Sequence, residues 1–144
     1  MKRITVLLAE DHQIVREGFR ALLKHEHDIE VVGKAADGRQ AVQLTRKLRP
    51  AVVVMDIAMP VLNGLEATRQ IRKDFPDTKV LILSAHSDDA YVEQVAVVGA
   101  SGFLLKQTSS DNLATAIREV QKGNTFFSPS IPKHLHKRNR EKMD

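Results

Sequence analysis

The chain has 144 residues, no cysteine, 42% hydrophobic and 28% charged residues, and a formal net charge of +4. A chain of this length is expected to form one domain that buries its core without disulfides or a structural metal. The lack of cysteine excludes a thiolate zinc site and gives no sign of an oxidising compartment. The strand-like run before Glu10 is too short for a signal peptide, and no apolar run reaches membrane-spanning length, so we expect a cytoplasmic protein.

The basic charge is concentrated at the carboxyl end of the chain. Residues 133–144 carry five basic and two acidic side chains, which account for +3 of the net charge. A basic tail can bind phosphate backbones, but it is more often a solvated linker. We therefore expect a nearly neutral domain in residues 1–124 and a basic linker or tail in residues 125–144.

Strand-like and helix-like patterns alternate five times along the chain. The expected strands are the apolar runs at residues 4–9, 29–33, 51–56, 80–83 and 103–105. A helix is expected after each strand, with apolar residues at three- and four-residue spacing within residues 14–23, 41–48, 65–75, 91–98 and 113–120. Pro50 and Pro76 stop the second and third helices, and Gly123 stops the last one.

This alternation predicts an α/β fold with a parallel sheet and helices on both of its faces. Because crossovers between parallel strands are right-handed, few topologies remain. We expect a flavodoxin-like (βα)5 doubly wound parallel sheet with strand order 2-1-3-4-5, in which the first and third strands are neighbours. Such sheets bind their ligands at the carboxyl ends of the strands.

Chemically useful side chains stand at the ends of four of the predicted strands. Glu10 and Asp11 follow the first strand, Asp56 closes the third, Ser84 follows the fourth and Lys106 follows the fifth. If these strands share one sheet, three carboxylates, a hydroxyl and an ammonium meet at one edge.

These residue types are suited to metal-assisted phosphoryl transfer onto a carboxylate. Clustered carboxylates recruit a cation, and Mg²⁺ prefers one or two carboxylates together with water and phosphate oxygens. Glu10, Asp11 and Asp56 are the candidate ligands of Mg²⁺, and the backbone carbonyl of Ala58 is a fourth. Asp56 would attack the phosphorus as the nucleophile.

Two further side chains would contact the transferred group. Lys106 would pair with Asp56 and then with a phosphoryl oxygen, and the Ser84 hydroxyl would donate to another oxygen. Each residue also has an ordinary interpretation. Asp11 before a helix is more often a cap, by about 3 to 1, and Asp56 alone could open an Asx-turn. Their joint position at the carboxyl ends of strands favours the site.

The histidines give no such signal. The pairs at residues 25 and 27 and at residues 134 and 136 are too isolated to predict metal sites. His12 and His86 lie near the predicted edge and could tune the site, but we expect both side chains to be exposed. Glycine-rich nucleotide motifs, a serine elbow and zinc signatures are absent from the sequence.

Taken together, these motifs resemble the receiver domain of bacterial two-component response regulators, over residues 4–123. The residues that carry the resemblance are Glu10-Asp11, the segment 55–60 around Asp56, Gly64, Ser84-Ala85 and Lys106. The segments 63–67, 99–106 and 116–129 are most similar to the NarL/FixJ (LuxR-type) subfamily.

The resemblance implies a role for each residue. Asp56 would accept phosphate from a sensor histidine kinase in a Mg²⁺-dependent reaction, with Glu10 and Asp11 holding the ion. Ser84 would be the switch hydroxyl, Phe103 the switch aromatic residue, and Lys106 the phosphate-contacting lysine. Receivers catalyse this transfer, and their own dephosphorylation, on themselves, so the resemblance implies no enzyme with a separate substrate.

The chain departs from the family pattern in several places: Glu10 stands for the frequent aspartate and Ser84 for the frequent threonine, both with the chemistry kept, and two departures change what is expected. Phe103 replaces the frequent tyrosine, so no phenol is available to bond Ser84, and any switching through Phe103 is a change of packing. Relatives continue into a helix-turn-helix DNA-binding domain that this sequence does not contain, so DNA would be contacted only through a domain absent here. The resemblance implies transcription regulation through that domain and a homodimer on phosphorylation. The alternative is a free-standing receiver that acts through protein contacts.

Two other functions were weighed. An aspartyl-phosphate phosphatase needs an acid-base carboxylate two residues after the nucleophile, where Ala58 stands, and an inserted substrate cap. A flavin- or nucleotide-binding domain needs a glycine cluster that cradles phosphate, and only Tyr91 and five phenylalanines are available to stack on a ring. Both fit the sequence less well than a receiver.

Overall fold

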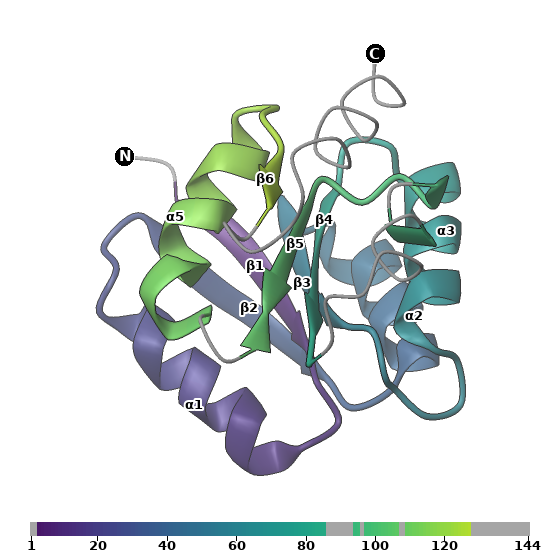
Figure 1. The fold of residues 1–144 in the computed structure, drawn as a ribbon, viewed down its shortest axis with the longest axis horizontal. Helices are drawn as coiled ribbons and strands as arrows, with labels where there is room; N and C mark the ends of the chain where they lie inside the picture. The colour runs from purple at the N-terminus through teal and green to yellow at the C-terminus, as the bar shows by residue number, and fades with distance from the viewer. Residues whose placement is uncertain (1–2, 86–93, 96, 107–108, 128–144) are drawn as a thin grey trace.

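The computed structural model describes residues 3–85, 94–95, 97–106 and 109–127. They form one parallel sheet of six strands in the order β2-β1-β3-β4-β5-β6, between two layers of helices (Figure 1). The strands are β1 (Ile4–Ala9), β2 (Ile29–Ala35), β3 (Val52–Asp56), β4 (Lys79–Ser84), β5 (Gly102–Leu105) and β6 (Phe126–Phe127). The predicted α/β class and the order 2-1-3-4-5 are confirmed, and β6 is added.

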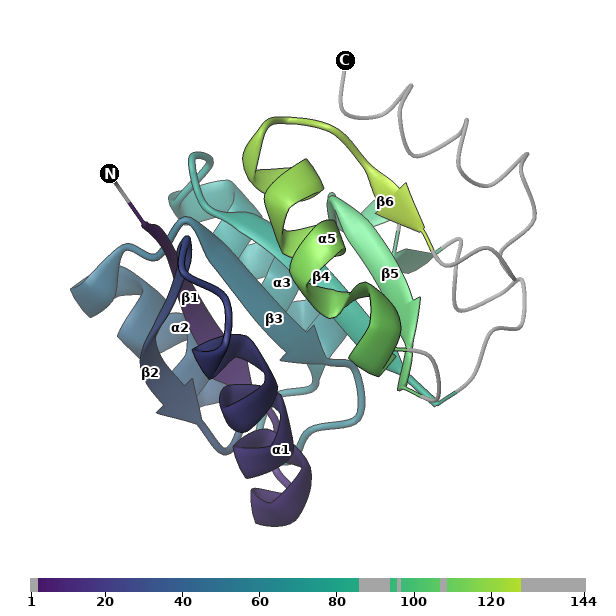
Figure 2. The same ribbon diagram turned by 90° about the vertical axis from the view of Figure 1, so that its left-hand side faces the viewer.

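Helices cover both faces of the sheet. They are α1 (Gln13–Lys24), α2 (Gly38–Leu48), α3 (Gly64–Asp74) and α5 (Ser109–Gln121). Figure 2 turns the face covered by α1 and α5 toward the viewer, with α2 and α3 behind the sheet. Half of the helix expected at residues 91–98 lies outside the described residues, and residues 94, 95 and 97 are helical. Among the described residues, no helix is long and apolar enough to cross a membrane.

Alternate residues of the central strand enter two separate cores. All five residues of β3 are buried. Val53 and Met55 pack into the cluster beneath α2 and α3, whereas Val52 and Val54 pack into the cluster beneath α1 and α5. A strand buried on both faces needs apolar residues at every position, which explains the unbroken run before Asp56.

Capping residues fix where the helices begin. The Asp37 side chain accepts a hydrogen bond from the Gln40 amide at the start of α2, and Asn63 accepts one from Glu66 at the start of α3. At the start of α1 the N-cap position belongs to His12, and its side chain makes no capping bond. The ordinary interpretation of Asp11 as a cap is therefore wrong.

The sixth strand was not predicted. The Phe126 amide donates to the Ser101 carbonyl over 3.1 Å, and Phe127 pairs with Phe103 across the sheet edge. Phe127 is 7% exposed and belongs to the core beneath α2 and α3. These two phenylalanines, expected in the tail, are thus part of the sheet. Residues 128–144 lie outside the described residues.

Candidate functional site

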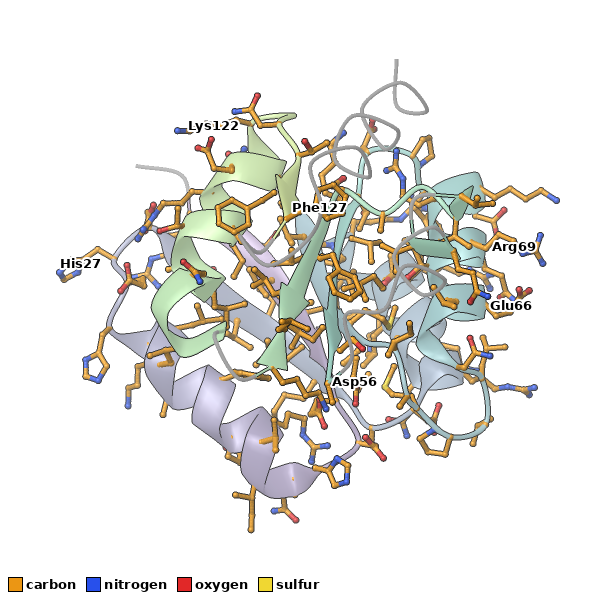
Figure 3. All side chains as sticks on the ribbon, in the orientation of Figure 1. His27, Asp56, Glu66, Arg69, Lys122 and Phe127 are labelled. Carbon is orange, nitrogen blue, oxygen red and sulfur yellow. The ribbon has the colours of Figure 1, made fainter. Side chains whose placement is uncertain are left out.

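The predicted site residues meet at the carboxyl edge of the sheet. Asp56 is the last residue of β3, Glu10 directly follows β1, and Lys106 directly follows β5. Because β1 and β3 pair in parallel, with Ala9 opposite Met55, Glu10 and Asp56 leave the sheet side by side. In Figure 3 Asp56 lies below the centre of the molecule, and Lys122 lies near its upper end.

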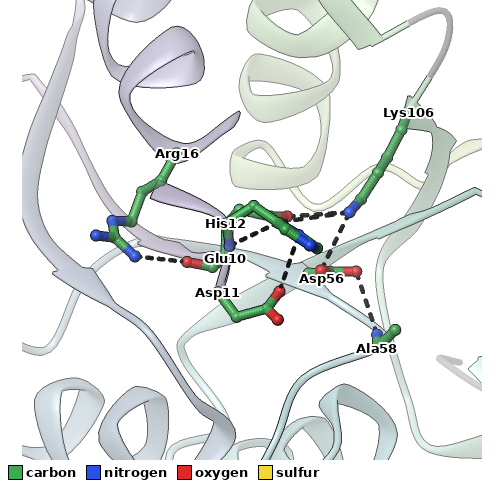
Figure 4. Close-up of polar contacts among 7 residues, drawn as sticks. All are labelled: Glu10, Asp11, His12, Arg16, Asp56, Ala58 and Lys106. Atoms are coloured by element: carbon green, nitrogen blue, oxygen red, sulfur yellow. Dashed lines mark hydrogen bonds and ion pairs between the residues drawn. The ribbon is translucent and has the colours of Figure 1, made fainter. Parts of the chain in front are cut away.

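Lys106 joins the carboxylates of β1 and β3. Its Nζ lies 3.1 Å from Asp56 Oδ2 and 3.2 Å from Glu10 Oε2 (Figure 4). The two carboxylate side chains are only 2% and 1% exposed, and the lysine is 24% exposed. The arrangement is a nearly buried cluster of two carboxylates and one ammonium, and the lysine is its more exposed member.

His12 and Asp11 complete the cluster toward solvent. His12 Nδ1 lies 3.1 Å from Glu10 Oε1 and 3.3 Å from Asp11 Oδ1. One ligand atom from each of Glu10, Asp11, His12 and Asp56 lies within 4.8 Å of the others. Three residues predicted as Mg²⁺ ligands are therefore together, and His12, expected near this edge with an exposed side chain, lies with them.

Burial governs the ionisation of Asp56. Desolvation, followed by the charge of Glu10, raises its pKa from 3.8 to about 6, although the Ala58 amide and Lys106 act in the opposite direction. Burial alone would lower the pKa of the Lys106 ammonium. The hydrogen bond and charge of Asp56, together with Glu10, outweigh burial and hold that pKa above its ordinary value. Above pH 6 the pair is an ionised carboxylate and an ammonium.

The backbone after β3 is tightly placed around Asp56. The Ala58 amide donates to Asp56 Oδ1 over 3.2 Å, and the Gly64 amide donates to the Ile57 carbonyl over 2.9 Å. A Cβ atom on Gly64 would lie 2.2 Å from the Asp56 carbonyl oxygen and 2.7 Å from Ile57 Cα. Gly64, one of the residues that carry the resemblance, is therefore needed because α3 starts against the backbone of Asp56.

Ser84 and Phe103 lie on the next two strands. Ser84 closes β4, whose Leu83 pairs with Asp56, so its hydroxyl belongs to the strand beside the carboxylate. Both side chains are fully buried, and Phe103 packs into the core beneath α2 and α3. These places are compatible with the roles expected of a switch hydroxyl and a switch aromatic residue. The roles themselves remain predictions.

One residue beside the site, Arg16, was not predicted from the sequence. Arg16 Nη1 donates a 2.8 Å hydrogen bond to the main-chain carbonyl of Glu10, whose amide donates to Ala35 over 3.0 Å. The Glu10 backbone is therefore held from both sides, and Figure 4 draws the bond from Arg16. The available signal was a cation early in a helix whose first turn carries no acid, a placement that opposes the helix dipole.

The donor set fits a divalent cation. When ionised, Glu10, Asp11 and Asp56 carry three negative charges, and Lys106 returns one positive charge. Asp11 Oδ1 is buried and accepts no hydrogen bond from the described residues, although the His12 ring is 3.3 Å away. Carboxylate oxygens with an excess of negative charge suit Mg²⁺. The cluster is an acidic pocket of the kind that such an ion needs.

A second hollow, of about 910 Å³, lies at the opposite edge of the sheet and holds none of the predicted site residues. Its lining includes Arg118, which forms ion pairs with Glu26 and Asp28 and so ties α5 to the segment before β2. Arg49 lies over the Phe75 ring, 4.5 Å from its centroid. These contacts account for the charges there as structural links.

Comparison with known proteins agrees with this geometry. The family model described as the response regulator receiver domain matches residues 6–118, most of the chain. The chain belongs to the response regulator receiver domain family. This receiver domain is 43% identical over 135 residues to the transcriptional regulatory protein DegU of Brevibacillus brevis, covering 94% of the chain and 57% of DegU.

Two further relatives place it in the NarL/FixJ (LuxR-type) group. It is 36% identical over 141 residues to the response regulator VraR of Staphylococcus aureus, covering 98% of the chain and 68% of VraR. A crystal structure of a LuxR-family two-component response regulator from Aurantimonas superposes with a TM-score of 0.88 at 34% identity, covering 94% of this chain and 97% of that one. The chain spans little more than half the length of DegU and about two thirds of VraR.

Proposed function

We propose that this receiver domain accepts a phosphoryl group on Asp56 from a sensor histidine kinase in a Mg²⁺-dependent reaction. The observation that carries the proposal is the ammonium of Lys106, 3.1 Å from Asp56 Oδ2 and 3.2 Å from Glu10 Oε2, beside an acidic cluster. A nearly buried carboxylate paired with a lysine, next to candidate ligands for a divalent ion, is an acceptor with its charge compensation already in place.

The transfer forms one bond and breaks one. A carboxylate oxygen of Asp56 attacks the phosphorus in line, the phosphorus–nitrogen bond of the donor phosphohistidine breaks, and the leaving imidazole takes up a proton from water. With a pKa of about 6, Asp56 is mostly ionised at neutral pH and can act as the nucleophile. The Lys106 ammonium would exchange its contact with the Asp56 carboxylate for a contact with a phosphoryl oxygen.

Other residues of the chain hold the acceptor in place. Glu10, Asp11 and Asp56, with the Ala58 carbonyl, would hold Mg²⁺, which when bound supplies positive charge to the phosphoryl oxygens. The Ser84 hydroxyl, on the neighbouring strand, would donate to a further oxygen after transfer. Phe103 would change its packing in the core after the transfer. Hydrolysis of the acyl phosphate at the same site would return the carboxylate.

The likeness to DegU suggests the output that phosphorylation controls. DegU is a transcriptional regulatory protein, and this chain matches little more than half of it. We propose transcription regulation through a LuxR-type DNA-binding domain outside this sequence, with a homodimer on phosphorylation. A free-standing receiver that acts through protein contacts is the alternative. The cytoplasmic location remains a prediction.

Labelling by a small phosphodonor tests the acceptor. We expect intact-protein mass spectrometry to show the mass gain of one phosphoryl group after treatment with acetyl phosphate and Mg²⁺, and no gain with EDTA. The variant Asp56→Asn should not be labelled. Asp74→Asn, which changes an exposed acid at the end of α3, is the matched control and should label as the wild type does. Full labelling of Asp56→Asn would refute the assignment.

A further inference from the structure

His12 lies at the solvent side of the acidic cluster, and its ring faces the carboxylates. Nδ1 is 3.1 Å from Glu10 Oε1 and 3.3 Å from Asp11 Oδ1, while the side chain as a whole is 68% exposed (Figure 4). The exposure agrees with the expectation from sequence. The contact with two candidate metal ligands does not follow from exposure and needs a separate explanation.

The separations match those between ligands of one ion. Around a six-coordinate ion with bonds of about 2.1 Å, neighbouring ligand atoms stand about 3.0 Å apart. The two distances from His12 Nδ1 to carboxylate oxygens, 3.1 and 3.3 Å, are close to that value. The ring nitrogen and an oxygen of Asp56 also belong to one group of atoms within 4.8 Å of one another. One ion can therefore contact the ring and the carboxylates together.

Packing and capping do not account for the placement of the ring. His12 occupies the N-cap position of α1, but its side chain makes no capping hydrogen bond, and most of it is exposed. A hydrogen bond from the ring to Glu10 Oε1 is the ordinary interpretation. The other oxygen of that carboxylate, Oε2, lies 3.2 Å from Lys106 Nζ. An ion that uses Oε1 either displaces the ring or takes it as a ligand.

We propose that His12 Nδ1 is a ligand of the divalent-ion site and gives this site a preference for a borderline transition metal such as Co²⁺ over Mg²⁺. The inference rests on the ion site of the proposed function. Mg²⁺ takes oxygen ligands and keeps its water, so it gains little from an imidazole. Co²⁺ binds imidazole well and lies above Mn²⁺ and Fe²⁺ in intrinsic affinity. Carboxylates then hold either ion, and the ring adds affinity for Co²⁺ alone.

Four proteins separate the contribution of the His12 ring to ion binding from that of the carboxylates. They are the wild type, His12→Gln, Asp56→Asn and His27→Gln. His27 is an exposed histidine away from the cluster and serves as the matched control. Binding of Co²⁺ and of Mg²⁺ is measured by calorimetry at one mildly alkaline pH. The visible absorption of bound Co²⁺ and its loss on addition of excess Mg²⁺ are recorded alongside.

We expect His12→Gln to weaken Co²⁺ binding at least tenfold, to change Mg²⁺ binding less than about twofold, and to alter the Co²⁺ absorption band. Asp56→Asn should weaken both ions, and His27→Gln should match the wild type. If the ratio of Co²⁺ to Mg²⁺ affinity is the same in His12→Gln as in the wild type, the inference is wrong although the ion site stands. If Asp56→Asn changes the binding of neither ion, the ion site of the proposed function fails as well.

Discussion

The burial of Asp56 has a measurable cost. Its folded-state pKa of about 6 lies above the ordinary 3.8, first because of desolvation and then because of Glu10. Between about pH 4 and pH 6 the folded state therefore holds a proton that the unfolded chain has lost. The free energy of unfolding falls as the pH rises through this window, and above pH 6 the full cost is present. The shift corresponds to about 3 kcal/mol at most, and to about 2 kcal/mol after residual solvent screening.

Replacing Asp56 by Asn keeps the shape of the side chain and removes the charge. Without divalent ions, we expect Asp56→Asn to equal the wild type in stability below about pH 4 and to exceed it by about 2 kcal/mol above pH 6. Lys106 keeps Glu10 as a partner at 3.2 Å, so the substitution does not leave the ammonium alone. Urea unfolding followed by circular dichroism at a series of pH values, with EDTA present, measures the difference.

The difference between the two curves is diagnostic because titrations shared by both proteins cancel. Asp74→Asn should give a flat difference across the same window, since that side chain is exposed. A flat difference for Asp56→Asn, or a variant less stable than the wild type at neutral pH, would mean that pairing with Lys106 outweighs desolvation, and the reasoning would be refuted. Mg²⁺ should stabilise the wild type more than the variant and so reduce the gap.

Three substitutions, two at glycines and one at a phenylalanine, test the packing around the site and at the sheet edge. Gly64→Ala would place Cβ 2.2 Å from the Asp56 carbonyl, so we expect urea unfolding to show a loss of more than about 2 kcal/mol, together with reduced labelling by acetyl phosphate. Gly18→Ala in α1 meets nothing within 4 Å and should be neutral or stabilising by about 0.5–1 kcal/mol, which is the matched control. Phe127→Ala should cost about 3–5 kcal/mol in the same assay, because its ring belongs to the same core as Phe103, and Mg²⁺ binding should be retained. A Phe127→Ala variant as stable as the wild type would mean that β6 is not part of the cooperative unit.

The central strands and the convergence of the site were predictable from the sequence. The run that ends in Asp56 had to be buried on both faces, and carboxyl ends of parallel strands share one edge. From these two considerations Glu10 and Lys106 can be placed beside Asp56, and no side-chain rotamer has to be known. The observed distances of 3.1 and 3.2 Å to Lys106 confirm the convergence.

Other features depend on side-chain direction or close approach, which a sequence pattern does not report. A two-residue strand such as β6 has no periodicity to detect. It fits because Gly102 leaves space: a Cβ atom there would lie 2.5 Å from the Phe126 carbonyl. Likewise, the orientation of His12 toward Glu10 rather than toward solvent is set by a single rotamer.

Lys106 connects Asp56 to strand β5, because its ammonium pairs with the carboxylate. It directly follows β5, and β5 is held between β4, which ends in Ser84, and the short edge strand β6. Phosphorylation would replace a carboxylate by a group with more negative charge and more distant oxygens, so the ammonium must extend toward it and loosen its contact with Glu10. Any displacement of Lys106 acts on β5, and Phe103 on that strand pairs directly with Phe127. Because the core around both rings is close-packed, we expect the shift to reach β6 as a discrete repacking.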